Sequence, residues 1–125
     1  MTTKFWIADE VDGPGRFPVG KLIRLAARTL SPDVAWQVTR ARGYGLLVNE
    51  LAGMLDTHDE VVMSTDELCS IADADDEWFY DLEAAASDGK LRIGVHDSAR
   101  MFVQGQRRVA GEIAGAFDQV TEADD

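Results

Sequence analysis

The chain contains a single cysteine, Cys69, and two histidines, His58 and His96. One thiol excludes an internal disulfide, and small secreted domains usually carry several, so we expect a reducing, cytoplasmic compartment. A structural zinc site needs four ligands, which one Cys and two His cannot supply, and neither a metal nor a cofactor is predicted. Long apolar runs are also missing, because no stretch approaches the roughly 18 apolar residues of a membrane-spanning helix. We therefore expect no membrane partner.

Basic residues are scarce in the middle of the chain. Twelve Lys and Arg stand against 23 Asp and Glu, which gives a net charge of −11. Between Asp56 and Asp88 the one potential cation is His58. This acidic block would repel phosphates, so we expect a cationic protein partner and no nucleic acid. Adaptation of every protein in the cell to high salt, or a GC-rich genome, is an alternative explanation of the same acidity.

The length of 125 residues fits a single domain, and 46% of the residues are hydrophobic, which suffices for one core. We expect one domain over residues 1–125, with residues 1–3 and 121–125 frayed. A subunit of an obligate homo-oligomer is compatible with the same composition.

Hydrophobic periodicity predicts the order of the secondary-structure elements. The predicted strands cover residues 4–8, 34–39, 60–63, 91–95 and 101–103. The predicted helices cover residues 21–30, 47–56, 64–71, 75–86 and 109–120. Ser64 and Glu67 have the spacing of a capping box, and Gly89 is a suitable end for the helix before it. For residues 34–39 a helix that begins after Ser31 is the alternative.

These elements predict an α/β fold, with α+β as the alternative. We expect a single compact domain with a mixed sheet of about five short strands and four or five helices on one face. The early alternation of strands and helices suggests parallel βαβ units, and residues 91–103 suggest a late β-hairpin. An amphipathic helix follows that hairpin.

A glycine-rich segment from Gly15 to Lys21 has the G-x-x-x-x-G-K spacing of a phosphate-binding loop. However, Leu22 stands where Ser or Thr would reach Mg²⁺, and Pro18 removes one backbone donor, so nucleotide binding is not predicted. The segment still supports a second hypothesis, a small enzyme or ligand-binding domain that takes an anionic small molecule. Its candidate anion-binding residues are Arg16, Gly20, Lys21 and His96.

Catalytic and calcium-binding patterns are incomplete. Residues 73–77 begin like a calcium loop, but Trp78 and Ala84 occupy the positions that need Gly and Glu. His96, Asp97 and Ser98 are neighbours on a predicted hairpin, where adjacent side chains point to opposite faces, so they do not predict a catalytic triad. An enzymatic function is therefore not the leading expectation.

The strongest functional signal is the predicted acidic helix over residues 75–86. If Trp78, Phe79 and Leu82 face inward, Tyr80 lies outward among carboxylates, and an aromatic anchor ringed by acids is suited to a cationic surface. The predicted partner-binding residues are Asp73, Asp75, Asp76, Glu77, Tyr80, Asp81 and Glu83. The sequence thus predicts a non-enzymatic acidic protein-binding module, such as a bacterial inhibitor or immunity protein that neutralises a basic, nuclease-like partner. A solvated helix with one amphipathic tyrosine is the simpler alternative.

Overall fold

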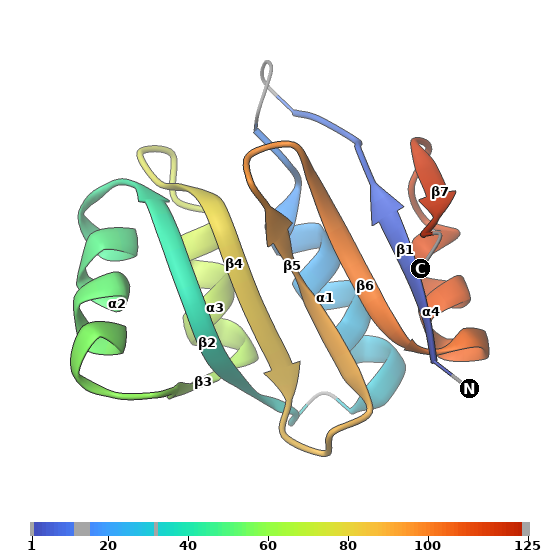
Figure 1. Ribbon diagram of the computed structural model, residues 1–125, viewed down its shortest axis with the longest axis horizontal. Helices are drawn as coiled ribbons and strands as arrows, with labels where there is room; N and C mark the ends of the chain where they lie inside the picture. The colour runs from blue at the N-terminus through green and yellow to red at the C-terminus, as the bar shows by residue number, and fades with distance from the viewer. Residues whose placement is uncertain (1, 12–15, 32, 124–125) are drawn as a thin grey trace.

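The computed structural model describes residues 2–11, 16–31 and 33–123, which form seven strands and four helices (Figure 1). The strands are β1 (Thr2–Ile7), β2 (Ala35–Tyr44), β3 (Val61–Ser64), β4 (Trp78–Ala86), β5 (Leu91–His96), β6 (Arg100–Gln106) and β7 (Val120–Glu122). The helices are α1 (Val19–Leu30), α2 (Leu46–Thr57), α3 (Thr65–Ala72) and α4 (Arg107–Ala114).

The strands form one sheet in the order β3-β2-β4-β5-β6-β1-β7, and every neighbouring pair is antiparallel. An α+β fold is therefore confirmed, with more strands than the five expected. The sheet is antiparallel and not mixed, because no two neighbouring strands are parallel. The β1-α1-β2 connection is nevertheless a parallel crossover, since β1 and β2 are four antiparallel pairings apart and run in the same direction. It differs from a simple βαβ unit because β4, β5 and β6 lie between its two strands.

Three helices, α1, α3 and α4, lie behind the sheet in Figure 1, and α2 lies beside β2 at one end. The core forms between those three helices and the sheet, because every second strand residue is apolar and buried there. Leu22 and Ile23 of α1 are fully buried, as is Ile93 of β5. Trp36 of β2 is also fully buried, and its indole Nε1 donates a 3.0 Å hydrogen bond to Thr65 Oγ1 of α3.

The opposite face of the sheet, which we call the open face, is not covered by α1, α3 or α4 (Figure 1). Alternation along the strands directs its side chains away from the core. Its charged and aromatic residues in the described strands are Lys4, Trp6, Arg40, Arg42, Tyr44, Trp78, Tyr80, Asp81, Glu83, Arg92, His96, Arg100 and Phe102. In a chain with a net charge of −11, this face carries five cations and two carboxylates.

Several local predictions are confirmed. The helix expected over residues 21–30 is α1, and the capping box at Ser64 is present, with both reciprocal hydrogen bonds to Glu67. The hairpin is β5–β6, whose turn residues Asp97 and Ser98 have φ angles of 51° and 56°, as a tight hairpin turn requires.

The helix predicted over residues 75–86 is wrong, because Trp78–Ala86 is strand β4 between β2 and β5. Gly89, expected to end that helix, lies in the β4–β5 turn with a φ of +76°. A register shift in the β2–β4 pairing explains the error. It leaves Phe79 and Leu82 buried three positions apart, which resembles helical spacing.

The two ends of the chain are also more regular than expected. Thr2 and Thr3, expected to be frayed, pair with Gln106 and Gly105 of β6. The helix predicted over 109–120 is shorter, since α4 ends at Ala114 and the chain continues into β7, which pairs with β1. Within the described ranges no helix has both the length and the apolar character needed to cross a bilayer.

Candidate functional site

The predicted partner-binding residues fall on the α3–β4 loop and on β4 instead of one helix. Three of their carboxylates have basic partners within the chain. Asp73 Oδ2 lies 2.5 Å from Arg24 Nη1, Glu83 Oε1 lies 2.6 Å from Arg92 Nη2, and Asp81 Oδ2 lies 3.8 Å from Arg40 Nη2. The hydrogen bond from Arg24 to Asp73 raises the pKa of the Arg24 guanidinium above its ordinary value. These pairs neutralise much of the surface predicted to be acidic.

Glu77, expected to face solvent, is buried with only 6% of its surface exposed. Its Oε1 accepts a 2.8 Å hydrogen bond from the backbone N–H of Val48, the third residue of α2. Gly45 precedes α2 with a φ of +115° and has no side chain to cap the helix; a Cβ there would overlap the Glu77 carboxylate. Glu77 therefore takes the place of a capping side chain and satisfies a donor at the α2 N-terminus.

Four of the predicted partner-binding residues are exposed: Asp73, which pairs with Arg24, and Asp75, Asp76 and Tyr80. Tyr80 belongs to an aromatic group at one end of the open face. Its ring centroid lies 6.5 Å from that of Trp78, which stacks on Tyr44 at 4.3 Å. The Arg16 guanidinium also lies over Trp78, 4.9 Å from its centroid. The sequence thus predicted an exposed Tyr80, but on a strand next to other aromatic side chains instead of among carboxylates.

The structure brings together three of the four candidate anion-binding residues. Arg16, Gly20 and Lys21 line a pocket of about 440 Å³ beside the start of α1. His96 lies elsewhere, on the open face, and Gly15 falls outside the described residues. Asp73 and Asp75 also line the pocket, so its lining has mixed charge.

The cations of this pocket are already engaged by acceptors of the same chain. Lys21 Nζ donates to the Ala116 carbonyl at 3.0 Å, and Arg16 Nη2 donates to the Asp75 carbonyl at 3.3 Å. Arg24 pairs with Asp73, whose carboxylate covers Gly20 so closely that a Cβ at Gly20 would overlap it. An anion would have to displace these contacts and approach two carboxylates, which disfavours strong binding.

The candidate nucleophile Cys69 and the candidate base His58 do not contact each other. Cys69 is buried, and burial raises the pKa of its thiol, which keeps it in the unreactive protonated form at neutral pH. His58 Nδ1 lies 3.1 Å from the Met54 carbonyl and 3.0 Å from Thr57 Oγ1, at the end of α2. Within the part of the chain that the structure describes, His, Cys, Asp and Glu side chains form no group of three that could hold a metal ion.

A surface that the sequence did not reveal lies on α2 and β3. We call it the α2–β3 surface and define it by Leu46, Leu47, Glu50, Met54, Asp56, Asp59, Glu60 and Val62. Its four apolar side chains are unusually accessible, with exposed fractions of 71% for Leu46, 38% for Leu47, 49% for Met54 and 60% for Val62. Only Val48 and Leu51 of α2 are fully buried, because this helix packs beside β2 and not under the sheet. Large apolar side chains exposed on neighbouring elements are typical of an interaction surface.

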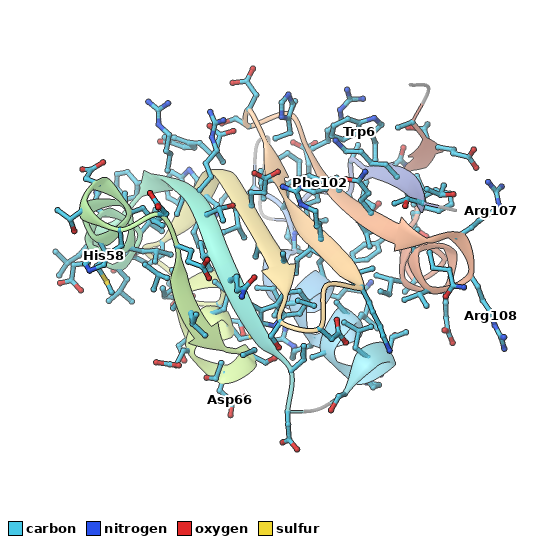
Figure 2. All side chains as sticks on the ribbon, turned by 60° about the horizontal axis from the view of Figure 1, so that its bottom comes forward. Trp6, His58, Asp66, Phe102, Arg107 and Arg108 are labelled. Atoms are coloured by element: carbon cyan, nitrogen blue, oxygen red, sulfur yellow. The ribbon has the colours of Figure 1, made fainter. Side chains whose placement is uncertain are left out.

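The charges of the α2–β3 surface are all negative. Within the described residues, none of the side chains of Glu50, Asp56, Asp59 and Glu60 forms an ion pair or hydrogen bond. No Lys or Arg occurs anywhere from residue 43 to residue 89. His58, at the end of α2 (Figure 2), is the one titratable nitrogen of this region. The surface therefore combines exposed apolar area with carboxylates that have no partner in the chain.

The absence of Lys and Arg from residues 43–89 was the signal that could have directed attention here, but the amphipathic pattern of residues 47–56 suggested an ordinary packed helix. Comparisons with protein-family models, with curated proteins and with solved structures each find no match to this chain.

Proposed function

We propose that the chain is a non-enzymatic module that binds a cationic protein partner through the α2–β3 surface. The observation that carries this proposal is the coincidence of four exposed apolar side chains with four carboxylates that lack partners. Burying the apolar side chains against a partner removes them from water and stabilises the complex. The surrounding acids increase the rate of encounter with a basic surface. The proposal keeps the class of partner expected from the sequence and moves the site from residues 73–83 to residues 46–62.

An inhibitor or immunity-type protein of a nuclease-like partner fits this arrangement. A nuclease presents a cationic cleft to nucleic acid, and the carboxylates of the α2–β3 surface would replace the phosphates there. A cytoplasmic location, where such a partner would need to be neutralised, is part of the same proposal. The anion-binding alternative at Arg16 and Lys21 has less support, because both cations already donate to carbonyls of the chain.

The test replaces two exposed apolar side chains of the surface by cations, Met54→Lys and Val62→Lys, in one variant. Because both side chains are about half or more exposed, the fold should tolerate the change. We expect the wild type to retain basic proteins in pull-downs, and purified candidates to lose at least about tenfold in affinity on titration with the variant.

The matched control is Gln119→Lys with Thr121→Lys, which adds the same charge at exposed positions near β7. It should bind each partner like the wild type. Equal loss in both variants would mean that net charge alone determines binding, and undiminished binding of the Met54→Lys/Val62→Lys variant would exclude the α2–β3 surface as the site.

A further inference from the structure

The open face holds a compact group of rings and cations that no helix covers, which we call the Trp6 cluster. It consists of Lys4 and Trp6 of β1, His96 of β5, and Arg100 and Phe102 of β6. The Trp6 ring centroid lies 5.6 Å from that of His96 and 6.2 Å from that of Phe102. Figure 2 shows Trp6 and Phe102 close together on this side of the sheet. Phe102 is only 6% exposed, yet it does not belong to the main core between sheet and helices.

Two cations of the cluster lie on rings instead of beside carboxylates. Arg100 Cζ lies 3.8 Å from the Trp6 centroid, and Lys4 Nζ lies 4.1 Å from it and 4.7 Å from that of Phe102. Neither Lys4 nor Arg100 has an ion pair within the described residues. A ring holds a cation in place without neutralising it, so both groups keep their capacity to bind an anion and have already lost much of their conformational freedom.

The rest of the open face increases this positive character. Its two carboxylates, Asp81 and Glu83, are paired with Arg40 and Arg92, which leaves Lys4, Arg42 and Arg100 without acidic partners in the described chain. The remaining surface carries the large negative excess of the molecule. An anionic partner is therefore attracted to this face and repelled by the α2–β3 surface, which gives the approach a preferred direction.

We infer that the open face, centred on the Trp6 cluster, binds an acidic segment of a second protein. Aspartate and glutamate side chains of that segment receive hydrogen bonds from Lys4, Arg42 and Arg100. The Trp6 cluster lies on β1, β5 and β6, away from α2 and β3, and its charge is opposite to that of the α2–β3 surface, so the inference does not depend on the proposed function.

A single-stranded nucleic acid is the competing anion. It would bind by stacking its bases on exposed ring faces, as on other sheet platforms. Here Lys4 and Arg100 already lie over the Trp6 ring, and Tyr44 and Arg16 lie over Trp78. Stacking would displace these side chains, and a chain with a net charge of −11 repels a polyanion at longer range. Carboxylates need no such displacement, because they bind the cations where the rings hold them.

The experiment uses an array of dodecapeptides with graded acidic content and a constant apolar content, with a uridine dodecamer as the nucleic acid probe. Affinities of the best peptides are measured by fluorescence anisotropy at low and at physiological salt. We expect binding to increase with acidic content and to weaken in salt, and Lys4→Glu/Arg100→Glu to lower the affinity by at least about tenfold. The indole N–H signal of Trp6, assigned in NMR spectra with Trp6→Phe, should shift when the peptide is added.

The matched control is Arg28→Glu/Arg108→Glu, which makes the same charge change at two exposed positions, on α1 and α4. It should leave peptide affinity within about twofold of the wild type. If the cluster variant does not fold, Lys4→Gln/Arg100→Gln against Arg28→Gln/Arg108→Gln makes the same comparison without new acids. Absence of binding to every acidic peptide, equal loss in cluster and control variants, or tighter binding of the uridine dodecamer would each overturn the inference.

Discussion

At the scale of single residues, the position of Glu77 shows how the acidic block contributes to the fold. Its carboxylate is buried instead of exposed at the surface. It accepts a hydrogen bond from the Val48 N–H at the start of α2. A negative charge at a helix N-terminus interacts favourably with the helix dipole. Gly45 has the space for this carboxylate because it has no Cβ. One acid of the block thus fixes the helix that carries the α2–β3 surface.

Replacing Glu77 by Ala should lower the free energy of unfolding by about 1–3 kcal/mol, because a buried backbone donor loses its acceptor. Urea-induced unfolding measures this change, and faster hydrogen exchange at the Val48 amide localises it to α2. Asp76→Ala is the control, since Asp76 is exposed next to Glu77 and should change stability by less than about 0.5 kcal/mol. Equal effects in the two variants would contradict the capping role.

At the scale of elements, the sequence predicted the helices and strands whose sequence patterns are local. The apolar stripe of α1, the capping box of α3 and the alternation in β5 and β6 depend on neighbouring residues, and all four elements form. Strand β4 depends on distant partners. It pairs with β2 and β5, and the register shift beside Phe79 breaks the two-residue alternation that would have identified a strand. The run of alanines at its end has high helix propensity, and sheet pairing overrides it.

The β4–β5 pairing can be tested at Gly94, which lies opposite Glu83 and Phe102. A Cβ there would overlap the Leu82 carbonyl of β4 and lie 2.8 Å from a Phe102 ring carbon. Gly94→Ala should therefore destabilise the protein by about 1–3 kcal/mol.

Gly53→Ala in α2 is the opposite case, because apart from the backbone of its own helix and its chain neighbours no atom of the described residues lies within 4 Å of a Cβ at that position. Alanine in a helix interior should raise stability by about 0.5–1 kcal/mol. Thermal and urea unfolding of both variants measure the expected decrease and increase in stability. A Gly94→Ala variant as stable as the wild type would mean that β4 and β5 are not closely paired.

At the scale of the whole molecule, charge is segregated. The α2–β3 surface is acidic and the open face is basic and aromatic, although β3 belongs to the same sheet as the open face. Composition indicated the acidic half, but it did not reveal the basic face, because Lys4, Arg42 and Arg100 come from three strands far apart in the sequence. The pairing register puts them on the same face of the sheet, and this register is set by long-range pairing that no local pattern encodes.

Concentrated negative charge should also make the stability of the protein depend on salt. At pH 7 the net charge is −11, and the excess negative side chains repel one another. Added NaCl screens this repulsion, so we expect the melting temperature to rise by several degrees between low and physiological ionic strength. Differential scanning calorimetry measures the shift. Near pH 4.4, where the net charge approaches zero, the effect should vanish; a melting temperature at pH 7 that does not change with salt would show that the acids are neutralised within the fold.

Strand β1 lies between β6 and β7, so its two neighbours are the last strands of the described chain. During synthesis this apolar strand leaves the ribosome about 90 residues before β6 can pair with it, a delay of roughly 5–20 s at ordinary rates of translation. Until then its backbone donors and acceptors, and the side chains of Phe5, Trp6 and Ile7, are open to other nascent chains. The order of strands in the finished sheet thus sets an interval in which the growing protein depends on chaperones or on low local concentration to avoid aggregation.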